Sequence, residues 1–226
     1  MRLDKYLSEA GVASRKELRG IIRAGRVTVD GAVVRAPDTK IAEDARVEVD
    51  GAVAGRQRGL VLMLHKPGGY VTSTEDPRDR TVMELLPPEY RHLRPVGRLD
   101  KDTEGLLLFT DDGDLLHRLI SPRHGVEKEY YAETDGEIDD GDVLAFRQGI
   151  TLRDGTVCLP AELISVAGGC RVVVREGKYH QVRRMLAARG KPVTYLRRER
   201  EGSLCLGDLP VGKYRILSPE EMCNLL

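Results

Sequence analysis

Apolar residues near the start of the chain follow the spacing of two short helices. They recur at helical intervals over residues 3–10 and again over residues 18–22, and a glycine follows each run where a helix would end. Ser14, with Glu17 three residues later, forms a capping-box pattern ahead of the second run. The pattern therefore predicts two amphipathic helices, the second of them opened by Ser14.

A hairpin and a linker follow these helices in the predicted order of elements. Valines alternate over residues 27–34 around Asp30-Gly31, a pair that favours a two-residue turn between antiparallel strands. Residues 51–59, with the sequence GAVAGRQRG, hold three glycines and no periodicity, so we expect a flexible linker there. The linker divides the chain into a small domain, residues 1–58, and a larger domain, residues 59–226.

The larger domain mixes predicted strands and helices without regular alternation. Apolar runs and turn signals predict strands over residues 60–64, 105–110, 127–134, 161–166 and 171–175. Predicted helices cover residues 114–119, with Asp114 as candidate N-cap, residues 139–149, residues 179–189 and a terminal helix that starts near Ser218. Because strands and helices do not alternate and no G-x-x-x-x-G-K-[ST] motif occurs, a doubly wound nucleotide-binding fold is disfavoured. The predicted fold class is α+β.

Composition restricts the partners and the compartment. The chain has 226 residues, 32% of them charged, and a formal net charge of zero, so any nucleic-acid site must be a local patch. No run approaches the roughly 18 to 20 apolar residues of a membrane helix, and no leader is evident, so we expect an unexported protein without membrane contact. The cysteines are far apart and form no Cys-x-x-Cys pair, which favours reduced packing residues of a cytosolic protein. They are Cys158, Cys170, Cys205 and Cys223.

Two local stretches are strongly basic. Residues 1–35 hold eight Lys/Arg against four Asp/Glu, and residues 171–200 hold ten against two. Arg15, Arg19 and Arg23 are spaced four apart, so they share one stripe of the second predicted helix. A basic stripe is most often only a solvated helix face. The excess in residues 171–200 is harder to explain as an ordinary surface and suggests a second RNA-facing patch.

The densest polar stretch, GRLDKDTEGLLLFTDDGD, runs from a loop rich in carboxylates into a predicted strand. Spacing alone leaves three readings of Asp100, Asp102 and Glu104: metal ligands, an acid/base pair, or solvated loop charges. Asp111 and Asp112 are better assigned to the turn after the strand.

Several motifs, taken in their order along the chain, resemble those of a known family. The run RLDKYLSEAGVASRKELRGIIRAGRVTVDG resembles the S4-type RNA-binding domain, and GRLDKDTEGLLLFTDDG, SPRHGVEKEY and EGKYHQVRRM follow it in sequence. Together they resemble the small-subunit ribosomal RNA pseudouridine synthase A family over nearly the whole chain. The resemblance implies a small S4-type domain of helices and a β-hairpin, joined to a larger, mainly antiparallel sheet domain of pseudouridine synthase type.

The resemblance also implies an activity. The expected reaction is isomerisation of a specific uridine to pseudouridine in small-subunit (16S) ribosomal RNA, with the base flipped out of its stack. The expected substrate is the RNA or a partly assembled ribosomal particle. We expect a cytoplasmic monomer that needs no cofactor and no metal.

Site residues follow from the matched motifs. Asp100 of GRLD is the implied nucleophile and Arg183 its counter-ion, which keeps the carboxylate ionised in a pocket that excludes water. Tyr130 of the Lys-x-Tyr motif would stack on the extracted base, with Lys128 as a substrate contact. Arg98 would contact or replace the displaced nucleotide. The residues expected to bind RNA are Lys5, Arg15, Lys16, Arg19, Arg23, Arg26 and Arg184.

Plainer interpretations of single residues remain open. Tyr130 could be a core aromatic of a strand. Arg98 could form a loop ion pair with Asp102 or Glu104. We interpret His180 as a structural histidine rather than a catalyst.

One departure from the family and two other classes of protein also remain. Glu201 stands before Gly202 where the family typically has an apolar residue, which affects local packing or an RNA contact. A non-catalytic RNA-binding or ribosome-assembly protein is one alternative. A metal-dependent nuclease or phosphotransferase using Asp100, Asp102 and Asp111 is the other, and it predicts an activity that chelators abolish.

Overall fold

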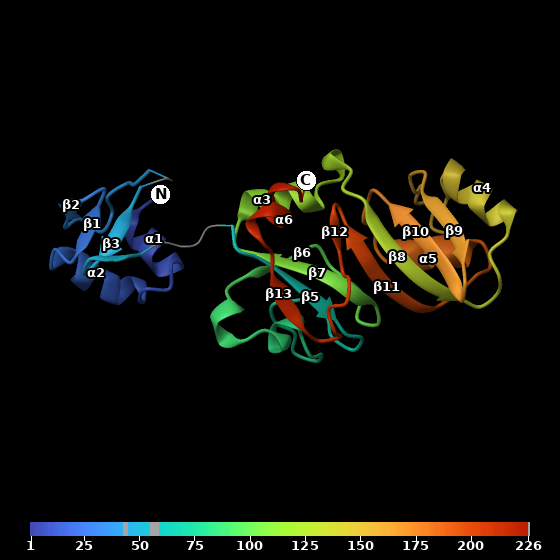
Figure 1. Cartoon of the computed structure of the whole chain (residues 1–226), viewed down its shortest axis with the longest axis horizontal. Coiled ribbons are helices and arrows are strands. Elements are labelled where there is room, and N and C mark those ends of the chain that lie inside the picture. The colour runs from blue at the N-terminus through green and yellow to red at the C-terminus, as the bar shows by residue number, and fades with distance from the viewer. Residues whose placement is uncertain (43–44, 55–58, 226) are drawn as a thin grey trace. The chain divides into compact units, whose positions relative to one another are not determined.

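The computed structural model describes residues 1–42, 45–54 and 59–225. The chain forms two compact units, Met1–Arg58 and Gly59–Leu226, here called the N-terminal unit and the C-terminal unit (Figure 1).

The N-terminal unit packs two helices on a small sheet. Its elements are α1 (Leu3–Glu9), α2 (Arg15–Arg23), β1 (Val27–Val29), β2 (Ala32–Val34), β3 (Val47–Val49) and β4 (Ala52–Val53), with strand order β2-β1-β3-β4. Ser14 and Glu17 form the capping box of α2, and Asp30 and Gly31 adopt positive φ angles of 49° and 81° at the β1–β2 turn. The predicted helix pair and hairpin are therefore confirmed.

The predicted linker agrees less well with the structure. Its first half contains β4, which pairs with β3, and Ala54 behind it is buried. Residues 55–58 of that linker lie outside the described residues. The partner strand β3 ends only three residues before β4, and Asp50-Gly51 between them is the same turn signal as Asp30-Gly31, with positive φ angles of 53° and 81°. The linker interpretation of residues 51–59 overlooked this second hairpin.

The C-terminal unit is built on a nine-stranded, mainly antiparallel sheet, and the fold is α+β as predicted. The strand order is β13-β5-β7-β11-β8-β10-β9, with β6 paired to β7 and β12 to β11, and only the β7–β11 pair among the described strands is parallel. The strands are β5 (Val61–Lys66), β6 (Arg94–Val96), β7 (Glu104–Thr110), β8 (Lys128–Thr134), β9 (Glu162–Val166), β10 (Gly169–Val174), β11 (Val193–Glu201), β12 (Leu204–Cys205) and β13 (Tyr214–Ile216).

Helices cover parts of both faces of this sheet (Figure 1). They are α3 (Gly113–Ile120), α4 (Asp140–Gln148), α5 (Gln181–Ala188) and α6 (Pro219–Cys223), with short 3₁₀ turns at η1 (Val82–Leu85), η2 (Pro88–Tyr90) and η3 (Pro122–His124). Asp112 and not the predicted Asp114 caps α3, since its carboxylate accepts the backbone N–H groups of Asp114 and Leu115. The predicted helix over residues 179–189 begins only at Gln181, so Tyr179 and His180 precede it.

The core lies on both sides of β7. Leu106 and Leu108 pack with α3 and α6 on one face, whereas Leu107 and Phe109 pack with η1 on the other. Gly105, at the start of β7, has a φ of 110°, and a Cβ there would lie 2.2 Å from the carbonyl oxygen of Arg198 on β11. Glycine thus allows these two parallel strands to meet at this point.

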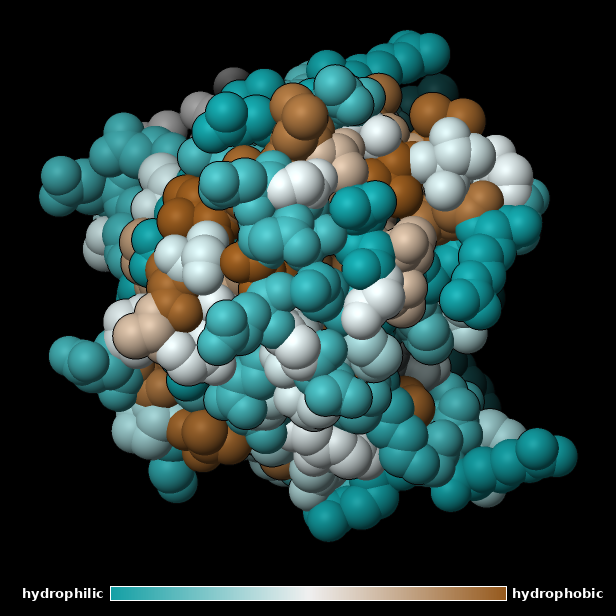
Figure 2. Space-filling model, turned by 90° about the vertical axis from the view of Figure 1, so that its right-hand side faces the viewer, coloured by the Kyte–Doolittle hydropathy of each residue, from teal (hydrophilic) through white to brown (hydrophobic). Residues whose placement is uncertain are grey.

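The surface and the cysteines complete the fold. Figure 2 shows one end of the C-terminal unit, where brown apolar side chains lie in small groups separated by teal polar ones. Cys158 and Cys170 are buried free thiols, as expected for packing residues, whereas Cys205 is exposed. Within residues 1–42, 45–54 and 59–225, no helix has the length and apolar character needed to cross a membrane.

Candidate active site

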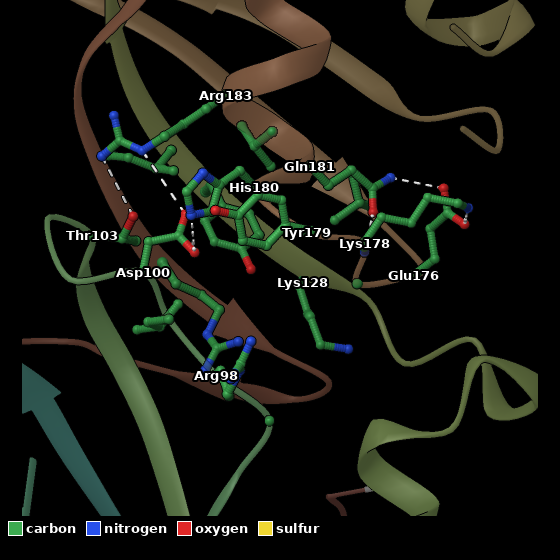
Figure 3. A pocket seen from close by; sticks show the side chains of 18 of the residues that line it. Arg98, Asp100, Thr103, Lys128, Glu176, Lys178, Tyr179, His180, Gln181 and Arg183 are labelled. Carbon is green, nitrogen blue, oxygen red and sulfur yellow. Dashed lines mark hydrogen bonds and ion pairs between the residues drawn. The ribbon is translucent and has the colours of Figure 1, made fainter. Parts of the chain in front are cut away.

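A pocket of about 350 Å³ in the C-terminal unit gathers polar side chains from distant parts of the sequence (Figure 3). They come from the loop before β7, from β8 and β11, and from the segment that leads into α5. Five residues predicted to act on substrate all line it: Arg98, Asp100, Lys128, Tyr130 and Arg183.

Lys66 holds the backbone of the loop that carries Asp100. This lysine is fully buried, and its Nζ donates to the carbonyl oxygens of Asp100 at 3.0 Å and Thr103 at 2.7 Å, and also to those of Pro67 and Lys101. Burial lowers the pKa of Lys66 to about 8, against the attraction of nearby carboxylates. Lys66 therefore fixes the backbone of the Asp100 loop. Sequence reasoning missed it, because its segment had only been assigned to a strand end and a tight loop.

Two side chains approach the Asp100 carboxylate. His180 Nε2 lies 3.4 Å from Oδ1, and Arg183 Nε lies 4.0 Å from Oδ2. Burial raises the pKa of Asp100 above its ordinary value, while His180 and Arg183 both favour the ionised form. Arg183 also contacts Asp102 at 3.1 Å, so its guanidinium spans two carboxylates.

His180 is the residue whose interpretation changes most. Its side chain lines the pocket and faces Asp100, rather than being satisfied within the core. Its backbone is left-handed, with φ 47° and ψ 37°, a conformation that costs a non-glycine residue roughly 1–2 kcal/mol. The ring of Tyr179 stacks on it, with centroids 3.9 Å apart and planes 17° apart. Its position three residues before Arg183 in one motif was the available signal.

The side chain of Tyr130 adjoins a buried group of charged residues. Arg198, only 1% exposed, faces the Tyr130 hydroxyl, donates to the Leu106 carbonyl at 2.7 Å and lies 3.2 Å from Glu201. Glu201, also 1% exposed, lies 3.7 Å from Lys128 Nζ. Burial lowers the pKa of Lys128, and Glu201 opposes that effect. Glu201, the departure from the family pattern, is thus an internal counter-ion for two cations and is too buried to contact RNA.

Arg98 differs from its neighbours in the pocket. It is exposed and makes no hydrogen bond or ion pair with any residue that the structure describes. The loop ion pair considered from the sequence is not found: Asp102 pairs with Arg183, and Glu104 accepts a hydrogen bond from Tyr195 at 2.8 Å. The Arg98 guanidinium is therefore available to a ligand at the rim.

The basic stretch at residues 171–200 is neutralised in space. Every one of its ten cations has a carboxylate oxygen within 4.0 Å, most of them from outside the stretch. The pairs are Arg171–Glu129, Arg175–Glu127, Lys178–Glu176, Arg183–Asp100, Arg184–Asp154, Arg189–Asp142, Lys191–Asp142, Arg197–Glu199, Arg198–Glu201 and Arg200–Glu127. The net charge that suggested a second RNA-facing patch is therefore largely paired within the fold, and the patch stays a prediction. Arg184 does not line the pocket.

The basic helix of the N-terminal unit is different. The side chains expected to bind RNA there are exposed: Lys5, Arg15, Lys16, Arg19, Arg23 and Arg26. Arg15 and Arg26 each pair with an aspartate of the same unit. Lys16, Arg19 and Arg23 have no carboxylate partner within the described part of the chain, so they present an unneutralised stripe on α2.

The geometry also bears on the metal alternative. Asp111 follows the far end of β7, a strand of seven residues that spans about 23 Å, so it cannot join Asp100 and Asp102 around one ion. No group of three or more His, Cys, Asp or Glu side chains in residues 1–42, 45–54 and 59–225 is arranged to hold a metal.

Comparison with known proteins extends this picture. The RNA pseudouridylate synthase family model matches residues 60–188, and the S4 domain model matches residues 1–47. The chain is 41% identical over 231 residues to ribosomal small subunit pseudouridine synthase A of Escherichia coli (strain K12), covering all of both chains. It is 39% identical to an uncharacterized RNA pseudouridine synthase of Bacillus subtilis (strain 168), covering 98% of this chain and 97% of that one. A crystal structure of a pseudouridylate synthase, 32% identical, covers all of both chains with a TM-score of 0.72.

Proposed function

The chain belongs to the RNA pseudouridylate synthase family, and we propose that it converts a specific uridine of small-subunit ribosomal RNA into pseudouridine in the pocket around Asp100. The observation that carries this proposal is the meeting of a partly buried carboxylate, a histidine, an arginine and a tyrosine in one pocket. Similarity over the full length to proteins named for the small ribosomal subunit supports the choice of RNA.

The reaction is an isomerisation, so its atoms balance within the nucleotide. The bond from C1′ to N1 breaks, the base turns while it stays bound, and a bond from C1′ to C5 forms. The hydrogen at C5 leaves as a proton and N1 gains one, with no change of oxidation state. Asp100 acts as the nucleophile: its carboxylate bonds transiently to the nucleotide and is released as the new carbon–carbon bond is completed. The scheme requires no cofactor and no metal.

Asp100 serves only when it is ionised, and the pocket resists ionisation. Burial raises its pKa, so the cationic side of the pocket has to offset that effect. We assign this role to Arg183 and include His180 in it, because its imidazole is the nearer of the two side chains.

The base and its neighbours occupy the rest of the pocket. Tyr130 stacks on the extracted uracil, a contact worth about 1–3 kcal/mol, above Lys128 as a polar substrate contact. Flipping the nucleotide out of its stack costs a few kcal/mol. Arg98, a rim cation without a partner among the described residues, contacts the displaced nucleotide or takes its place.

The N-terminal unit supplies affinity. Exposed cations on α2 contact RNA phosphates and release counterions, which makes binding salt-dependent. We propose that the protein acts in the cytoplasm as a monomer. Its substrate is the RNA or a partly assembled ribosomal particle.

Pseudouridine mapping tests the proposal. Small-subunit ribosomal RNA, free and in assembling particles, is incubated in chelator with wild-type protein, with Asp100→Asn and with the control Asp102→Asn, which changes an exposed carboxylate two residues away. One new pseudouridine that is absent only with Asp100→Asn is expected. No product on either substrate would overturn the proposal. A parallel incubation without chelator that yields RNA cleavage or phosphoryl transfer instead of pseudouridine would favour the metal-dependent alternative.

A further inference from the structure

Tyr179 is an aromatic side chain that the proposed reaction does not use. It is 69% exposed, more than any other large apolar side chain among the described residues, yet it lines the pocket of Asp100. Burying a tyrosine ring is favourable, so a ring left this open beside a ligand pocket is a candidate contact surface.

The ring is held in a defined place. Arg184 donates to the Tyr179 carbonyl at 3.2 Å, and the Lys178 backbone N–H donates to Oε1 of the buried Gln181 at 2.9 Å. These bonds tie the segment before α5 to the helix that carries Arg183. One face of the ring stacks on His180, which itself faces Asp100 (Figure 3). A flat aromatic surface therefore extends from solvent to the nucleophile.

Base flipping creates a need for such a surface. When the target uridine turns into the pocket, the base beside it loses a stacking partner. Single-stranded RNA bases stack readily on aromatic side chains, and a tyrosine with only two side-chain torsions loses little entropy in doing so. Arg98, unpartnered within the described chain, lines the same pocket and is suited to the phosphate that joins the two nucleotides.

We infer that Tyr179 is the stacking platform for the base adjacent to the target uridine, a second nucleobase subsite next to the Asp100 pocket. The inference rests on the proposed function, since it requires a flipped uridine. The two rings then have different roles. Tyr130 stacks on the uracil inside the pocket, and Tyr179 stacks on the adjacent base at the rim.

A double-mutant cycle between protein and RNA tests it. Binding is measured with the full chain in an Asp100→Asn background, so that RNA is not converted, using an RNA that carries the mapped uridine. The base on its 5′ side, or on its 3′ side, is replaced by an abasic nucleotide. We expect one abasic site to weaken binding by about 5- to 150-fold when Tyr179 is present, the range for one base–aromatic stack. With Tyr179→Ala, that abasic site should cost almost nothing further.

Controls separate the platform from a bracing role toward His180. Tyr179→Phe and Tyr179→Trp keep a stacking ring and should keep the penalty of the abasic site. Tyr214→Ala, at an exposed tyrosine on β13 outside the pocket, should also leave that penalty unchanged. Additive losses on both sides of the uridine would overturn the inference, even if Tyr179→Ala slows the reaction. Absence of pseudouridine with wild-type protein would instead overturn the proposed function.

Discussion

The two most basic stretches of the chain use their positive charge in different ways. Around α5 and β11, each of ten cations has a carboxylate partner, and one pair, Arg198 with Glu201, is almost fully buried. Along α2, Lys16, Arg19 and Arg23 face solvent without a carboxylate partner in the described chain. Charge counted along the sequence made the first stretch look the stronger RNA surface, whereas charge in space favours the second.

The difference has a physical consequence. A buried pair has lost its water, so each partner depends on the other and the pair fixes geometry. An exposed cation keeps its water and counterions and can exchange them for a phosphate. We therefore expect changes in the C-terminal unit to affect stability and catalysis, and changes on α2 to affect salt-dependent affinity.

The largest expected effect follows removal of a buried charge. Glu201→Gln leaves Arg198 and Lys128 without their shared counter-ion and should lower the free energy of unfolding of the C-terminal unit by about 3–5 kcal/mol. Urea denaturation measures the loss. The triple change Glu201→Ile, Arg198→Met and Lys128→Met removes all three charges and should recover most of it. A loss below about 1 kcal/mol in the single variant would contradict an ion pair that fixes structure.

Arg183 comes next. Arg183→Met should lower kcat/KM by roughly 100-fold, as expected on losing one preorganised electrostatic contact. It should also raise the pKa of Asp100 further, because one of the charges that favour its ionised form is gone. Since the reaction needs the carboxylate, the acid limb of the kcat/KM profile should move to higher pH.

The pH profile of matched variants checks this. Arg183→Lys keeps a positive charge and should move the limb less. Arg171→Met removes a pocket-distant cation, paired with Glu129, and should leave the limb in place. An unmoved limb in Arg183→Met would mean that His180 alone keeps Asp100 ionised.

The salt dependence of RNA binding sharpens the comparison most directly. Changing Lys16, Arg19 and Arg23 together to Gln should reduce the slope of log affinity against log salt by about 2, at roughly 0.7–0.9 per phosphate contact. The matched change of Arg171, Arg184 and Arg197, each already paired, should reduce it far less. Equal reductions in the two triple variants would remove the distinction between the stretches.

The smallest effect is expected at the start of α2. Ser14→Ala removes the cap that accepts the Glu17 N–H and should destabilise the N-terminal unit by about 1 kcal/mol, whereas Ser14→Gly should cost only a few tenths. Thermal unfolding of the two variants gives the difference. Equal stabilities would show that packing of Leu18 and Ile22, rather than the cap, fixes where the helix begins.

Much of the fold could be predicted because its signals are local. The capping box at Ser14, the Asp30-Gly31 turn and the apolar run of β5 each depend on residues close together in sequence. Strand β11 was missed because its second half, residues 197–201, is charged at every position and is neutralised only in the fold, by partners within the strand and from β8. These residues have the composition typical of an exposed segment, although the strand lies inside the sheet, between β7 and β8.

The candidate site could likewise be predicted from the sequence only in part. The sequence resemblance predicted which residues would meet in the pocket, and the five substrate residues do line it. It did not predict His180 beside Asp100, because that contact depends on a left-handed backbone at the residue before α5. Nor could it explain Glu201, whose partner Lys128 lies on another strand, or Lys66, whose four carbonyl partners are brought together only by the fold.

Gly105, in the T-E-G-L segment, is required for the packing of two strands and not for the reaction. A genetic screen for inactive variants would recover position 105 as readily as position 100, since any side chain there would collide with the Arg198 backbone. The two classes would separate by abundance: Asp100→Asn protein should accumulate normally, whereas Gly105→Ala protein should be depleted by proteolysis of its unfolded state. Part of this signature thus records how closely two strands approach, and intolerance to mutation alone would misidentify that glycine as part of the reaction.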